Sequence, residues 1–266
     1  MSLTSPAFQS FLDMIAKTRP LADSYFGDCV SMKWDAWRVV RLLNAELDRL
    51  ALTPPRTVLD LGCGIGVYEG ELRRRWPATR LTGVDFSRRN ILAARTHEPT
   101  ATFLHGDAES LPLSNATIDL ALAIEVMEHF LHPERAVAEL ARVVRPGGLL
   151  IVVVPLSPPI PFVRTISRVA TRFIGSKVIE EGEFKEHMRI YRRRTLLREF
   201  GVDWKVRRLV TFNLMTFVVA AMEKISGKLA RGATERSQRL LDSLDLGCGH
   251  FLYAKALLVL ERKGRS

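Results

Sequence analysis

A glycine-rich turn is the part of this sequence best suited to hold a small ligand. Residues 58–66 read Val-Leu-Asp-Leu-Gly-Cys-Gly-Ile-Gly, an apolar run that ends in alternating glycines. Only glycine takes positive φ at low cost and lets the backbone approach a ligand closely. A dinucleotide-binding turn would need glycine or alanine at position 67, where valine stands. Asp60 also suits a cationic ligand better than a pyrophosphate, which it would repel.

Further polar residues follow the next apolar runs along the chain. Asp85, Asp107 with Ala108, and Glu125 with His129 each come at or just after the end of such a run. Any one acid could simply cap a turn or a helix. The carboxyl ends of parallel strands, however, meet at one edge of a sheet, where open α/β sheets bind their ligands. Four such loops together therefore predict one site.

Strands and helices alternate in the segment that carries these residues. Short β-branched runs are separated by amphipathic stretches, a pattern typical of a parallel sheet with right-handed crossovers. The expected strands are 57–60, 80–85, 102–105, 118–124, 149–154, 204–212 and 251–261, and the expected helices are 8–50, 67–75, 88–95, 133–144, 162–174 and 195–200.

These motifs resemble those of the class I S-adenosylmethionine-dependent methyltransferases, in particular a small-molecule subgroup similar to the enzymes of ubiquinone and menaquinone biosynthesis. The matching segments follow the order and spacing of the family across residues 57–155. They are 60–64, 83–87, 105–112, 118–129 and 142–148.

The resemblance implies S-adenosyl-L-methionine as the cofactor. Asp85 would bind both ribose hydroxyls, because a carboxylate has two acceptor oxygens. Phe86, Asp107 and the backbone of Ala108 would contact the adenine, and the glycine turn would pass beneath the methionine part. The cofactor-binding residues that the resemblance implies are Asp60, Gly62, Cys63, Gly64, Asp85, Phe86, Asp107, Ala108 and Glu125.

Two histidines are candidate catalytic bases. Methyl transfer from a sulfonium needs an aligned nucleophile and a group that takes its proton. His129 follows the fourth strand, and His187 lies after the fifth in a segment similar to one common among small-molecule members. A structural hydrogen bond is the alternative for each. Glu125, Glu128 and His129 could converge on one helical face, but a hard cation needs more oxygen ligands, so no metal is predicted.

The expected fold is α/β, a Rossmann-like, seven-stranded, doubly wound sheet with an N-terminal helical cap and helical lid insertions. The cofactor-binding core would occupy the second of four parts. These are a helical cap (1–53), the S-adenosylmethionine-binding core (54–155), lid and substrate-recognition insertions that include the sixth strand (156–246), and a final strand that completes the sheet (247–266).

The positive charge lies outside the predicted core. The 266 residues carry 39 Lys+Arg and 29 Asp+Glu, a net charge of +10, yet residues 1–160 sum to −1 and residues 161–266 to +11. A helix over 162–174 would place Arg164, Arg168 and Arg172 on one face and apolar residues on the other. That pattern is typical of a membrane-surface helix. The alternative is a lid whose arginines are solvated.

We expect an enzyme that methylates oxygen or carbon of a small, lipophilic acceptor related to quinone or lipid precursors. One alternative is an RNA methyltransferase that uses the basic half, with residues 192–194 facing phosphates. Nucleic acid is disfavoured because that half has few aromatic residues and no RNA-binding module. Another alternative is a catalytically silent partner subunit that binds the cofactor.

The same composition predicts a cytoplasmic protein. Peripheral contact of this protein with an anionic membrane is a further expectation. Three widely spaced cysteines do not form a C-x-x-C pair, which favours a reducing compartment. The first twenty residues do not follow a signal-peptide pattern, and the apolar runs are shorter than the ~20 residues of a spanning helix. Nothing in the sequence indicates an oligomeric state.

Overall fold

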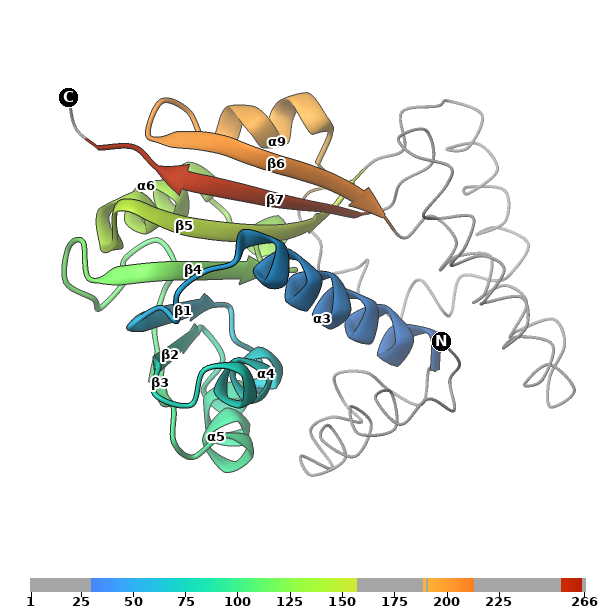
Figure 1. The fold of residues 1–266 in the computed structure, drawn as a ribbon, viewed down its shortest axis with the longest axis vertical. Coiled ribbons are helices and arrows are strands. Elements are labelled where there is room, and N and C mark those ends of the chain that lie inside the picture. Colours follow the sequence, from blue (N-terminus) through green and yellow to red (C-terminus); the bar gives the residue numbers. More distant parts are fainter. Residues whose placement is uncertain (1–29, 157–188, 190, 213–254, 265–266) are drawn as a thin grey trace, which may run out of the picture.

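The computed structural model describes residues 30–156, 189, 191–212 and 255–264, which form one sheet with helices on both faces (Figure 1). The strands among them are β1 (Thr57–Leu61), β2 (Arg80–Asp85), β3 (Thr102–His105), β4 (Ile118–Ile124), β5 (Val144–Pro155), β6 (Trp204–Phe212) and β7 (Lys255–Arg262). The helices are α3 (Val30–Leu50), α4 (Val67–Arg75), α5 (Arg88–His97), α6 (Pro133–Val143) and α9 (Arg193–Glu199), with a 3-10 turn η1 (Met127–His129).

The strand order is β3-β2-β1-β4-β5-β7-β6. Neighbouring strands from β3 to β5 are parallel, whereas β7 runs antiparallel to both β5 and β6. The chain moves outward from β1 in one direction and then restarts at β4 on its other side. This doubly wound, seven-stranded sheet confirms the predicted fold class, and its switch point lies between β1 and β4.

The sheet is apolar on both faces because helices cover both. Along β5, Leu150 and Val152 belong to the core beneath α6 and α9, and Ile151 and Val153 belong to the core beneath α3 and α4. All four are fully buried. Successive strand residues point to opposite faces, so a continuous apolar run is what a doubly covered strand requires.

Three strands differ from their predicted limits: β1 extends one residue further, to Leu61, and β5 and β7 differ as follows. β5 begins at Val144 rather than at residue 149, because Val144 pairs with Ile118 before a register shift lets Leu149 pair with Leu120. β7 runs from Lys255 to Arg262; residues 251–254 lie outside the described part of the chain. The expected helix 162–174 and the start of the expected helix 8–50 also lie outside it.

No helix among the described residues combines the length and apolar character that crossing a bilayer requires.

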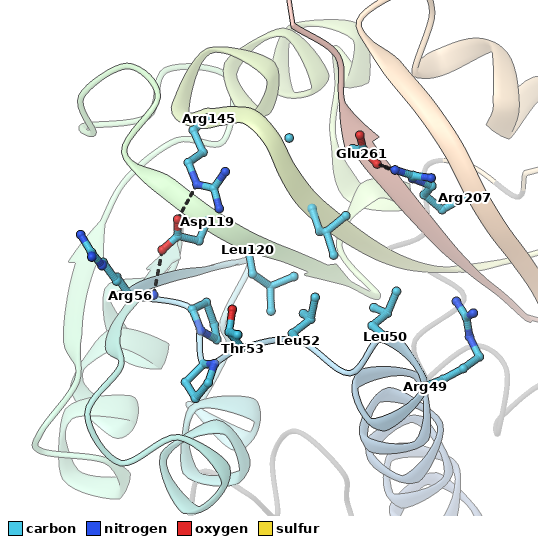
Figure 2. A pocket seen from close by; sticks show the side chains of 14 residues that line it. Arg49, Leu50, Leu52, Thr53, Arg56, Asp119, Leu120, Arg145, Arg207 and Glu261 are labelled. Atoms are coloured by element: carbon cyan, nitrogen blue, oxygen red, sulfur yellow. Dashed lines mark hydrogen bonds and ion pairs between the residues drawn. The ribbon is translucent and has the colours of Figure 1, made fainter.

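Asp119 joins three segments at the amino-terminal edge of the sheet (Figure 2). Its Oδ2 accepts hydrogen bonds from the backbone N–H groups of Arg56 at 2.8 Å and Thr57 at 3.0 Å, and its Oδ1 accepts from Nε of Arg145 at 2.5 Å. Burial alone would raise the pKa of Asp119, but these donors outweigh it and hold the pKa below its ordinary value. One carboxylate thus ties the start of β1 to β4 and β5.

Replacing Asp119 with Ala is expected to lower the free energy of unfolding at pH 7 by about 1–3 kcal/mol, because backbone donors at the start of β1 lose their acceptor. Since the folded-state pKa is depressed, this contribution is present above the unfolded pKa and disappears as the pH falls through the folded one. Urea denaturation at pH 7 and at pH 3 measures both effects.

The matched control is Asp48→Ala, which removes an exposed ion pair with Arg75 at 2.6 Å. Exposed pairs contribute little, so an equal loss in both variants would contradict this role for Asp119.

Candidate functional site

The turn after β1 has the backbone geometry that only glycine accommodates easily. Gly62, Gly64 and Gly66 have φ angles of 74°, 54° and 83°. A Cβ built on Gly62 would lie 2.2 Å from Cγ2 of Val126, in the loop after β4. The turn therefore approaches the neighbouring loop so closely that a side chain at position 62 has no room.

Asp85, the last residue of β2, fastens this turn. Its Oδ2 accepts a hydrogen bond from the N–H of Gly64 at 2.9 Å, and its Oδ1 accepts one from the N–H of Ser87 at 2.7 Å. Oδ1 also accepts from Nδ2 of Asn90 at 3.2 Å. A carboxylate oxygen can accept more than one hydrogen bond, so Oδ2 keeps acceptor capacity for a ligand hydroxyl. The next residue, Phe86, is 79% exposed, and its ring centroid lies 6.2 Å from that of His105.

The loop after β3 continues the same edge. Asp107 is exposed and accepts a hydrogen bond from the N–H of Glu109 at 2.9 Å, while Ala108 is half-buried. Glu109 in turn accepts one from the N–H of His132 at 2.9 Å. The loops after β3 and β4 are thereby tied together beside the predicted adenine position.

Glu125, directly after β4, has an unusual backbone. It is a non-glycine residue with φ of 52°, and its N–H donates to the carbonyl of Val153 at 2.8 Å. Its carboxylate pairs with Nζ of Lys255 at 2.5 Å. Such strained positions persist where the surroundings over-determine them. Lys255, the first residue of β7, was not predicted from the sequence, because only the antiparallel pairing of β7 with β5 brings it to this edge.

Glu125, Glu128 and His129, which could share one face of a helix, differ in burial. Glu128 is fully buried and His129 is exposed, although they are neighbours in the 3-10 turn η1. Within the described residues, no three His, Cys, Asp or Glu side chains are grouped to hold a metal ion. His187, the second predicted base, lies outside the described residues.

Two carboxyl groups are buried beneath the turn. Asp60 in β1 is 2% exposed and Glu69 in α4 is 1% exposed. Burial raises the pKa of Asp60 to about 8; a hydrogen bond with Glu69 lowers it and the charge of Asp85 raises it by smaller amounts. Burial and the charge of Asp60 raise the pKa of Glu69 well above its ordinary value. Glu69 was missed by the sequence analysis, because nothing in a helix pattern shows which acid faces a strand carboxylate.

Cys63 contributes to the turn through its backbone. Its N–H and that of Gly62 both donate to the carbonyl of Val84, at 3.2 and 2.7 Å. Its side chain is buried in an apolar cluster with Ile91 and Phe103. Burial, with the nearby acids, raises the pKa of the thiol far above its ordinary range, so this side chain is a neutral packing group and no nucleophile.

A groove of about 830 Å³ lies at the opposite edge of the sheet (Figure 2). Arginines line it over an apolar floor, and three of them are paired: Arg49 with Glu46, Arg145 with Asp119, and Arg207 with Glu261. It adjoins the amino ends of β1 and β4, so it is separate from the edge that carries the predicted site residues.

Comparison with known proteins agrees with this arrangement. Residues 59–152, which include the glycine turn and the loops after β2, β3 and β4, match a family model described as a methyltransferase domain. The chain contains a class I S-adenosylmethionine-dependent methyltransferase domain. The family predicted from the sequence is confirmed for this domain, and the match agrees with the predicted enzyme class and cofactor.

Named relatives share parts of the chain. A ubiquinone biosynthesis O-methyltransferase of Maricaulis maris is 31% identical over 170 residues, which are 60% of this chain and 63% of that protein. A phthiotriol/phenolphthiotriol dimycocerosates methyltransferase of Mycobacterium ulcerans is 38% identical over 98 residues, 36% of each chain. This chain spans between 36% and 63% of the length of the curated relatives that it matches.

A solved structure with the same fold is that of the [4+2]-cyclase SpnF. The TM-score is 0.57 with 20% identity, over 85% of this chain and 82% of that one. This likeness supports the fold alone, and the name of that protein shows that the fold does not fix the reaction.

Replacing Gly62 with Ala is expected to destabilise the domain by about 2–4 kcal/mol, because strain at positive φ adds to a clash with Val126. Gly147→Ala is the matched control: its φ is 76°, but the nearest atom to an added Cβ is the end of the Arg145 side chain at 3.8 Å. Chemical denaturation should give a smaller loss for Gly147→Ala. Equal losses would mean that the close approach to Val126 is unimportant.

The buried acids predict that stability falls as the pH rises from about 5 to 8. Their folded-state pKa values are raised, so the folded protein binds more protons than the unfolded chain in this window, and ionisation favours unfolding. Glu69→Gln should flatten the slope by about one proton, ~1.4 kcal/mol per pH unit. Denaturation midpoints at several pH values measure it, with Glu71→Gln, at the surface of α4, as the control. An unchanged slope in Glu69→Gln would contradict the buried, protonated state of this residue.

Proposed function

We propose that this protein binds S-adenosyl-L-methionine at the glycine-turn edge and transfers its methyl group to a small, lipophilic acceptor, at oxygen or carbon. The observation that carries the proposal is the convergence of the turn after β1 with Asp85, which already fastens Gly64 at 2.9 Å. Because position 62 is a glycine, backbone atoms face that edge. The residues present fit a cofactor that carries both a positive charge and a vicinal diol.

Each cofactor contact is assigned to one strand end. The backbone of Gly62, Cys63 and Gly64 would lie beneath the methionine part, and Asp85 would accept from both ribose hydroxyls. The adenine would lie beside the exposed Phe86 ring, with Asp107 and the backbone of Ala108 at its polar edge. The acidic residues nearest to the positively charged part are Asp60 and, after β4, Glu125.

The bound cofactor would supply an electrophilic methyl group on a sulfonium, so the protein has to align the acceptor and manage its proton. His129 is exposed on η1, directly after β4, where it could take a proton from an acceptor hydroxyl. His187 is the second proposed base. If the acceptor is an aromatic carbon, the same base would remove the proton from that carbon after transfer.

The lipophilic acceptor is supported by relatives named for ubiquinone biosynthesis and for phthiotriol dimycocerosates. It is also supported by the positive charge of residues 161–266, which suits contact with an anionic membrane surface. Flotation with vesicles tests that contact. Binding to anionic but not neutral vesicles is expected, and equal binding to both, or to neither, would refute an electrostatic contact.

The reaction itself is tested with S-adenosylmethionine labelled in its methyl group. Purified protein is incubated with extracted quinone and lipid precursors, with small polar acids, and with RNA. Transfer of label to a lipophilic product is expected. Label in RNA would favour the alternative activity, whereas cofactor binding without transfer to any acceptor would favour a partner subunit.

Replacing Asp85 with Ala should weaken cofactor binding by about 2–4 kcal/mol, because two ribose hydrogen bonds and the fastening of Gly64 are lost. Titration calorimetry measures the affinity. Ser87→Ala is the control, since Ser87 caps α5 by accepting from the N–H of Asn90 without facing the turn. Unchanged affinity in Asp85→Ala would refute the assignment of the ribose position.

Replacing His129 with Ala should lower the rate of methyl transfer by about 10²–10⁴-fold with little change in cofactor affinity, if a general base is needed. Single-turnover rates across pH measure this, and His132→Ala, in the following loop, is the control. A rate equal to that of the wild type would leave His187 as the only proposed base.

A further inference from the structure

Glu69 lies beside Asp60, in space that a glycine leaves open. Asp60 in β1 is in register with Gly83 in β2. A Cβ built on Gly83 would be 2.5 Å from Oε1 of Glu69 and 2.8 Å from Sγ of Cys63. The carboxyl group of α4 therefore occupies the position next to Asp60 that a side chain of β2 would otherwise take.

Asp60 and Glu69, hereafter the carboxyl pair, lie side by side without another side-chain partner in the described part of the molecule. None of their four buried oxygens accepts a hydrogen bond from a hydroxyl or cationic group there. Oε1 of Glu69 takes the space over Gly83, which is in register with Asp60. Two ionised carboxylates buried this close would repel one another, and neither would have a proton to donate to the other. At least one member of the pair is therefore a neutral acid.

The described residues around the pair provide no counter-charge for a second ionisation. The nearest charges are Asp85 at the end of β2 and Glu98 after α5, both acidic, and the thiol of Cys63 is neutral. Arg73, on α4, is directed to Glu98 at 3.9 Å and to backbone carbonyls. The ring of His97 lies 3.0 Å from the carbonyl of Gly66. A cation that reaches this edge would therefore supply the missing positive charge and favour loss of a proton from the carboxyl pair.

Glu69 is the member that keeps its proton. It projects from α4 into the core, whereas Asp60 lies on β1 one residue before its end, adjacent to the glycine turn. A cation at the turn therefore acts first on the Asp60 carboxyl, and the more distant Glu69 remains the proton donor of the pair.

We propose that Glu69 is a positioning residue for the cofactor: as a neutral acid it donates a hydrogen bond to Asp60 and so stabilises the Asp60 carboxylate when a cationic cofactor displaces the Asp60 proton. This inference rests on the proposed function. The proton leaves Asp60 for the solvent, no covalent bond other than its O–H changes, and Glu69 keeps its own proton throughout.

Titration calorimetry with S-adenosylmethionine at pH 6.5, in two buffers of different ionisation enthalpy, counts the released protons. The amino group of the cofactor is already charged at this pH, since α-amino groups titrate near ~8. The wild type should release about one proton. Glu69→Gln keeps an N–H donor and should bind within about twofold of the wild type, with the same proton release.

Glu69→Met keeps the volume but removes the donor. It should bind about tenfold or more weakly at pH 6.5, its affinity should level off at a higher pH, and its resistance to urea should increase because a buried acid is gone. A merely structural role would not combine higher stability with weaker binding. Glu71→Gln, on the surface of α4 beside Arg74, should behave as the wild type.

Infrared spectroscopy of the free protein reports the proton directly. The carbonyl band of the protonated acids should persist above the pH at which free carboxylic acids ionise, and Glu69→Gln should remove the part that Glu69 contributes while leaving the part from Asp60. Three results would each overturn the inference. Glu69→Met could bind the cofactor with the affinity and pH profile of the wild type, Glu69→Gln could bind it as weakly as Glu69→Met, or the carbonyl band could be absent. If the wild type itself does not bind the cofactor, the proposed function fails; if it binds and Glu69→Met binds equally, only this role of Glu69 fails.

Discussion

The close approach of the turn after β1 to the loop after β4 is the constraint on which the candidate site depends. At Gly62 a methyl group would meet Val126 at 2.2 Å, so the two loops touch where the strand order reverses. Asp85 then fastens the turn through Gly64, and the N–H groups at the start of the turn donate to Val84. These contacts all join β1 to its neighbours β2 and β4. The site is thus a property of the switch point rather than of any single motif.

Electrostatics divide the sheet into two unlike edges. The glycine-turn edge carries the acids Asp60, Glu69 and Asp85, the first two buried with raised pKa values, and Lys255 pairs with Glu125 at the end of β4. The opposite edge has a groove lined by arginines, three of them paired with acids (Figure 2). A protein of net charge +10 therefore presents an acidic edge to its proposed cationic cofactor. The overall charge of the chain says little about that site.

The shared fold leaves the reaction open, as the similarity to a cyclase illustrates. What distinguishes this chain lies in particular side chains: a strained Glu125 held by Lys255, and a buried acid, Glu69, that fills the space over Gly83. Such features change the chemistry of an edge without changing the sheet that carries it. They are the places where this domain would differ from others with the same strand order.

The sequence by itself determined the strands, their parallel order and the positions of the loop residues at strand ends, because these depend on local pattern and on a topology that chirality restricts. It did not determine which side chains meet. The pairing of Asp60 with Glu69 requires the β1–β2 register and the seating of α4, and the pairing of Glu125 with Lys255 requires that β7 run antiparallel beside β5. The opposite burial of the neighbours Glu128 and His129 in η1 is likewise set by packing. Contacts between residues distant in the chain are decided by packing, and only the tertiary structure contains that information.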